Sequence, residues 1–303
     1  MASLGRHIET FTGTNHVSEI LPPGTNPQPY VPFPDFGRDA SYATTNSNSD
    51  YHSLQAKYDR RLAKGLDMLG AFTWGMTRTN ADDLLSGGGI AGFRAPDLPN
   101  FGIQADMGLA SYDIRKAFSW SGTYQIPFGH AQHFGASTNK IEDGVLGGWM
   151  FNWIVTLDDG QPITIGCVTP GASDLGCYAL ETGQPKYAGQ HNVNQWMNPA
   201  AFANPPKATA IGQTDYAPLG GGATQIIGPG FHRLDYSLFK QFQTTERTRL
   251  EFRAEFFNIT NHPNFALPSY TNYLQTSTFG KITSTRDSPN DPRQIQFALK
   301  FYF

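Results

Sequence analysis

The sequence lacks long hydrophobic runs and carries few charges. No segment approaches the roughly 18 or more apolar residues that a membrane-spanning helix needs, and the mean hydropathy is -0.39. Charged residues make up 16% of the chain, below the ~25% typical of soluble domains. The net charge is -3, so the dense basic face of a nucleic-acid binder is missing too. We therefore exclude a helical membrane protein and predict no nucleic-acid partner.

Catalytic motifs are also missing. The sequence has no H-E-x-x-H, C-x-x-C or G-x-S-x-G pattern, and the run Gly87–Gly89 is not followed by the Lys of a phosphate-binding loop. His130 and His133 form an H-x-x-H pair, for which an ordinary polar turn is favoured over a metal site. We predict that the protein is not an enzyme and has no catalytic, cofactor-binding or metal-binding residues.

Cysteine is scarce, with two residues, Cys167 and Cys177, in a stretch rich in Gly and Pro. Their spacing does not match a zinc site. A disulfide in an extracytoplasmic loop and a pair of free thiols both remain open.

A secretion signal is not visible at the start. Residues Met1–His7 contain neither a basic n-region nor an apolar h-region. A protein exported from the cytoplasm needs such a signal, so for an exported protein we expect that the chain is a fragment or that its start has been lost or misassigned.

Aromatic residues, in contrast, are abundant at 13% of the chain, which favours strands over helices. The C-terminal ten residues alternate strictly, with apolar side chains at every odd position. Successive side chains of a strand point to opposite faces, so one face is apolar and the other mostly polar. We predict a transmembrane strand whose lipid-facing residues are Ile295, Phe297, Leu299 and Phe301, ending at Phe303.

The same alternation recurs upstream. In residues 249–258, Leu250, Phe252, Ala254 and Phe256 share one face, and the candidate lumen-facing charges Arg249, Glu251, Arg253 and Glu255 share the other. These charges suit either an anchoring network against a plug, which is favoured, or a path for ligand. Further alternating segments lie near residues 54–58, 66–76, 118–126, 149–155 and 234–238, and two weaker ones near 3–11 and 36–43.

The connections between these segments alternate in length. Short turns follow Arg60 and residue 241, whereas 79–111, 158–230 and 260–292 are long. Short turns on one side and long loops on the other are typical of outer-membrane barrels. With Phe303 on the periplasmic side, the long loops lie outside the cell, but residues 12–35 are then placed on the periplasmic side. A soluble β-sandwich also alternates, yet its strands are usually shorter than the ~10–13 residues expected here.

The last third resembles a known family. It contains the segments Gly228–Lys240, Leu250–Asn258, Asn261–Phe265, Phe279–Thr283 and Arg293–Lys300, preceded by Trp196–Phe202. These segments resemble the C-terminal barrel end of TonB-dependent outer-membrane receptors of the Oar-like type, which carry a carboxypeptidase-regulatory-like domain. The resemblance covers nearly the whole chain from about residue 3.

The resemblance implies an all-β fold: an antiparallel transmembrane β-barrel segment of about eight or nine strands from a larger barrel, with long extracellular loops. Full members also carry an N-terminal domain, a plug and a TonB-interacting segment. We expect residues 1–303 to be the C-terminal barrel portion, without plug and N-terminal domains, in the cell outer membrane. The resemblance also implies that Phe303 is an assembly signal, which we favour over a role only as an aromatic residue of the membrane interface.

The expected partners are outer-membrane lipid, the barrel assembly machinery and an unknown external ligand, with TonB reached only through the absent N-terminal regions. Uptake of that ligand is the expected function. A structural or adhesive surface protein and a small pore are the alternatives.

Overall fold

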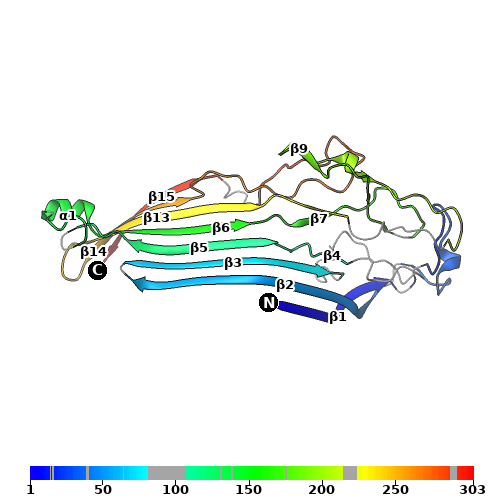
Figure 1. The fold of residues 1–303 in the computed structure, drawn as a ribbon, viewed down its shortest axis with the longest axis horizontal. Coiled ribbons are helices and arrows are strands. Elements are labelled where there is room, and N and C mark those ends of the chain that lie inside the picture. Colours follow the sequence, from blue (N-terminus) through cyan, green and yellow to red (C-terminus); the bar gives the residue numbers. More distant parts are fainter. Residues whose placement is uncertain are drawn as a thin grey trace.

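A computed structural model describes residues 1–13, 15, 17–38, 41–63, 65–80, 107–129, 132–137, 139–174, 176–213, 224–286 and 292–303. Its main feature is a nine-stranded antiparallel sheet (Figure 1) in the order β1-β2-β3-β5-β6-β13-β14-β15, with short β4 paired to β3. The strands are β1 (Ala2–Gly13), β2 (Ser41–Ala63), β3 (Leu66–Thr79), β4 (Gly108–Leu109), β5 (Lys116–Gln125), β6 (Trp149–Asp158), β13 (Phe231–Gln243), β14 (Arg249–Phe257) and β15 (Gln294–Tyr302). The predicted all-β antiparallel fold is confirmed.

Smaller elements lie at the two ends of this sheet. Helix α1 (Lys140–Leu146) lies at the end where the C-terminus also lies (Figure 1). At the other end, the described residues form two single-turn helices and three two-stranded ladders. These elements are η1 (Gln28–Tyr30), η4 (Pro199–Ala201), β7 (Pro162–Thr164) with β12 (Gln225–Ile227), β8 (Leu180–Glu181) with β11 (Phe202–Ala203), and β9 (Tyr187–Asn192) with β10 (Gln195–Met197). No helix among the described residues is long and apolar enough to cross a membrane.

One predicted strand and one predicted location are wrong. Residues 36–38 are not part of a strand, and β2 begins at Ser41 and continues without interruption to Ala63. The predicted segments 36–43 and 54–58 are therefore not two separate strands, and the number of strands counted along the chain falls by one. The described residues 17–38 between β1 and β2 consequently lie with the long loops (Figure 1), whereas the count from sequence placed 12–35 at the opposite end of the sheet.

The register of the ladders sorts the side chains into two faces. Phe252 lies opposite Leu299, and Ala254 opposite Phe297, while Phe151 lies opposite both Leu238 and Tyr124. We call this side the apolar face. It runs across every long strand from β2 to β15, and its aromatic rings contact one another, as Trp120 and Trp153 do at 5.2 Å between ring centroids and Phe252 and Phe297 at 6.3 Å.

A glycine makes room for the Trp153 ring. A Cβ atom at Gly122 would lie 2.4 Å from the Trp153 ring. That is well inside van der Waals contact, so a side chain at Gly122 would displace the indole. The apolar face nevertheless stays largely uncovered at its C-terminal edge, where Phe297 is 68% exposed.

The hydrophobic cores lie among the loops rather than on the sheet. The first joins Val17, Ile20, Leu21 and Val31 from the β1–β2 connection to Ala172 and Ala208 from the β6–β13 connection. The second, larger core lies within the β6–β13 and β14–β15 connections and includes Ile165, Met197, Phe202, Tyr273 and Phe279. The protein thus buries its apolar side chains at one end and exposes them along one face, as expected when lipid rather than protein covers that face.

Candidate functional site

The polar face of the sheet carries a ladder of charges on β14. Glu251 is buried, and its carboxylate accepts hydrogen bonds from Gln241 Nε2 at 2.8 Å and from Arg253 Nε. Arg253 Nη1 also lies 4.0 Å from Glu255 Oε1. Lys300 of β15 is the register partner of Glu251 and adds a further positive charge to its surroundings. The structure thus brings Glu251, Arg253 and Glu255 into one network.

Aromatic rings flank the two arginines of the ladder. The Arg253 guanidinium lies 5.6 Å from the centroid of the Phe239 ring, and that of Arg249 lies 4.5 Å from the centroid of the Tyr302 ring. A guanidinium at this distance from an aromatic ring is attracted by the ring quadrupole. Each arginine is therefore held against a neighbouring strand, and this part of the sheet presents a rigid polar surface.

A second polar group lies nearer the loop end. Arg233 Nε contacts both carboxylate oxygens of Asp235 at 3.0 Å. The same Asp235 accepts a hydrogen bond from the backbone N–H of Asn258 at 2.7 Å. Asn258 follows β14 with a positive φ of 48°, and its Oδ1 accepts a hydrogen bond from the His262 N–H at 3.1 Å. These contacts fix the point at which the chain leaves the sheet for the last long loop.

The larger loop core surrounds a buried tyrosine. The Tyr273 hydroxyl donates to Asn204 Oδ1, which also accepts from the backbone N–H groups of Val168 and Thr169 at 2.9 and 3.0 Å. Burial raises the pKa of the Tyr273 phenol, and the hydrogen bond from Val168 lowers it in part. The neutral phenol therefore fits this site, and the network ties the β14–β15 connection to the β6–β13 connection.

A disulfide closes the adjacent turn. Cys167 and Cys177 are joined with a Cα–Cα distance of 5.4 Å, and the Cys167 N–H donates to the Cys177 carbonyl at 3.0 Å. Of the two alternatives left open by the sequence, the structure has the bonded pair. The cross-link lies next to the Asn204 network, so the two features stabilise the same part of the loops.

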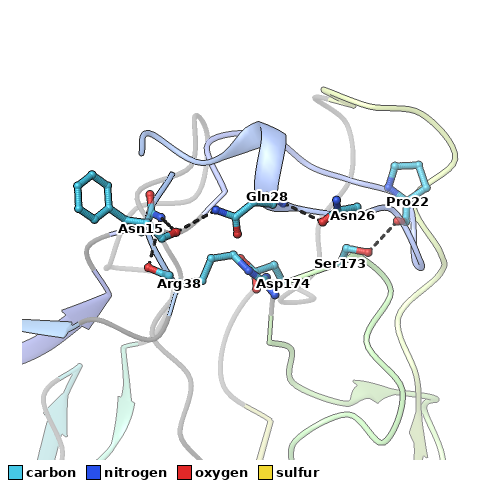
Figure 2. A network of polar contacts seen from close by, with 9 residues as sticks. Asn15, Pro22, Asn26, Gln28, Arg38, Ser173 and Asp174 are labelled. Carbon is cyan, nitrogen blue, oxygen red and sulfur yellow. Dashed lines mark hydrogen bonds and ion pairs between the residues drawn. The ribbon is translucent and has the colours of Figure 1, made fainter. Parts of the chain in front are cut away.

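The β1–β2 connection is locked onto the β6–β13 connection (Figure 2). The Asn15 side chain is buried and donates to the carbonyls of Phe33 and Phe36 at 2.8 and 3.1 Å, which closes the connection on itself. Ser173 Oγ then donates to the Pro22 carbonyl at 3.0 Å, and Arg38 pairs with Asp174. Loops that start from different parts of the sheet thus form one assembly over its outer end.

Other candidate residues lie apart from these networks. His130 lies outside the described residues, and His133 packs edge-on against Phe134 at 4.6 Å. Among the described residues, no group of three or more His, Cys, Asp or Glu is placed to hold a metal ion. Phe303 is 98% exposed, and its ring stacks on Phe301 at 6.2 Å. Ile295, Phe297, Leu299 and Phe301 all lie exposed on one side of β15.

Two functional features were missed in the sequence. Lys240 of β13 belongs to the apolar face, because it lies opposite Trp149 and Phe252. Helix α1, near it, was not predicted at all. A signal was available, because Asn139 and Glu142 have the spacing of a capping box, in which each side chain bonds the other residue's backbone N–H.

A protein-family model matches nearly the whole chain. The model of a family described as "Outer membrane beta barrel domain" matches residues 1–296. No curated protein and no solved structure matches the chain.

Proposed function

Because the chain belongs to the outer membrane β-barrel domain family, and so to a protein of the cell outer membrane, we propose that it is the C-terminal barrel part of a TonB-dependent transporter or receptor. In this proposal the apolar face contacts lipid and the polar face lines the lumen. The loop assembly captures an external ligand, and TonB acts through N-terminal regions outside this chain. The role is binding and passage rather than catalysis.

The charge ladder on β14 is the observation that carries the proposal. An Arg facing lipid near mid-bilayer costs roughly 2–4 kcal/mol, and a Glu costs less, so Arg249, Glu251, Arg253 and Glu255 favour a wet interior. The ladder is also internally paired, which leaves a firm polar wall for a plug to rest against. The segments that resemble Oar-like receptors point to a family in which such a polar wall surrounds a plug.

The size of the native protein tests this proposal. An antibody against the β6–β13 connection would be used to probe outer membranes of the native organism. A polypeptide far larger than the 33.3 kDa of this chain, with plug peptides identified by mass spectrometry in the same band, is the expected result. A band at about the mass of this chain alone would refute TonB-coupled transport.

An adhesive or structural surface role is the second candidate. The packed loop cores favour it, because loops that bury Leu21, Ile165 and Phe279 form a pre-organised surface. This alternative would be supported if intact cells that display the protein bound to surfaces or to other cells. The same cells should then show no uptake that depends on the inner-membrane energy source.

A further inference from the structure

Helix α1 presents apolar side chains with no protein cover. Ile141 is 80% exposed, Val145 is 61% exposed and Leu146 is 50% exposed. At 3.6 residues per turn, these three fall within one arc of about 140°. Glu142 lies in the same arc, but its carboxylate accepts a hydrogen bond from the Asn139 N–H at 3.2 Å, which completes the cap.

Two side chains fix α1 against the apolar face of the sheet. Trp149 Nε1 donates to the Val145 carbonyl at 2.9 Å. Lys240 Nζ donates to the carbonyls of Gly144 and Asp143 at 2.7 and 3.2 Å. Both Trp149 and Lys240 belong to the apolar face, so the helix lies on that side of the sheet and not on the polar side.

Lys240 explains why the helix is needed there. Its ammonium lies 5.0 Å from the Phe242 ring centroid and 5.8 Å from that of Trp149, and the residue is only 4% exposed. A lysine on a lipid-facing surface is tolerated only when its charge is satisfied or reaches the interface. The carbonyls of α1 satisfy it, and the helix covers it.

The location of α1 along the sheet points to one leaflet. The connections at this end include the short ones, at residues 64–65 and 244–248, whereas the loop cores lie at the other end (Figure 1). Short turns are periplasmic in outer-membrane barrels. The helix therefore lies at the end of the sheet that we assign to the periplasmic side, and its bonds with Trp149 and Lys240 join it to the apolar face.

We propose that α1 is an interfacial anchor: Ile141, Val145 and Leu146 insert into the periplasmic leaflet of the outer membrane at the boundary between headgroups and acyl chains. Short amphipathic segments bind interfaces in proportion to the apolar area that they bury. Lipid is the occupant because the helix that carries the arc is bonded to Trp149 and Lys240, which belong to the face that we assign to lipid. The inference rests on the assignment of the apolar face to lipid, and not on transport.

Fluorescence quenching tests the anchor. Single cysteines replace Ile141, Val145, Leu299 or Glu246 in the full chain, each carrying a bimane label, in vesicles of phosphatidylethanolamine and phosphatidylglycerol. The native cysteines are joined in a disulfide and do not compete for the label. Quenching by lipids with a doxyl group near the headgroup end of the acyl chain is compared with quenching by aqueous iodide.

At Ile141 and Val145, the doxyl lipid should quench several-fold more strongly than iodide. Glu246, exposed in the β13–β14 turn at the same end of the sheet, should show the reverse. Dominant iodide quenching at Ile141 and Val145 would overturn the anchor, and so would protection from both quenchers, which would mean that protein covers the helix. The Leu299 label separates the two ideas: if doxyl lipid fails to quench it, the lipid assignment of the apolar face is itself wrong.

Discussion

Replacing Phe297 by Arg should prevent β15 from entering the membrane. Phe297 lies near the middle of β15, opposite Ala254, and is exposed on the apolar face. An Arg near the bilayer midplane costs roughly 2–4 kcal/mol. At 1.4 kcal/mol per tenfold change, the equilibrium for the inserted state falls by about 30- to 700-fold. Loss of the ring contact with Phe252 at 6.3 Å adds to this cost.

The matched control changes the neighbouring residue. Gln296 points to the polar face and lies opposite Glu255, so Gln296→Arg introduces the same side chain where an acidic partner is close. Both variants would be made in the full-length protein that contains this chain, and its folding into lipid vesicles would be followed over a urea gradient, with the fraction of heat-modifiable, protease-resistant protein as the signal. Phe297→Arg should lower the urea midpoint strongly and Gln296→Arg only slightly. Equal shifts for the two variants would refute the assignment of the faces.

Three further predictions concern the charge ladder and the loop cores. Glu251→Ala should lower the urea midpoint by the equivalent of about 1–3 kcal/mol, because Gln241 and Arg253 lose their hydrogen-bond acceptor. Glu255→Ala should change the midpoint little. Equal effects of the two substitutions would contradict the central place of Glu251 in the charge network. Replacing Cys167 and Cys177 by Ser should destabilise the loop assembly by about 2–3 kcal/mol, because the cross-link is lost. Protease should then cleave faster between residues 159 and 230 on intact membranes, and an unchanged cleavage rate would contradict a stabilising role of the disulfide. Burial raises the folded-state pKa of Tyr273, so the phenol contributes fully to the stability of the loops below the ordinary tyrosine pKa of about 10, and this contribution should be lost as the pH rises above it. Protease resistance measured against pH should therefore fall at high pH, and Tyr273→Phe should remove this fall. The same profile in both proteins would assign the titration to another group.

Alternation predicts a strand only where the strand has two unlike faces. It located β13, β14 and β15 well, because lipid and water impose opposite demands on their two sides. It failed in the first half of β2, where the run Thr44–Ser49 is polar at every position. Backbone pairing with β1 extends the strand there, and that pairing leaves no mark in the side-chain pattern.

The loop contacts could not be predicted for a different reason. Arg38 and Asp174 are 136 residues apart in the sequence, and Leu21 and Ala172 belong to a core that neither connection forms alone. Such pairs depend on the order of the strands between them. Lys240 was missed because a lysine interrupts the apolar alternation of its strand. Only the structure shows that the carbonyls of α1 accept hydrogen bonds from its ammonium group.

The joined loops also constrain the order of events during assembly. The β1–β2 connection can contact the β6–β13 connection only after both have crossed to the far side of the bilayer. Contacts between residues so distant in sequence form slowly and late. We therefore expect the pairing of Arg38 with Asp174, and of Ser173 with Pro22, to form after the strands between them are in place. Once these loop contacts have formed, they oppose the withdrawal of any one of the strands between them, so the joined loops stabilise the assembled sheet.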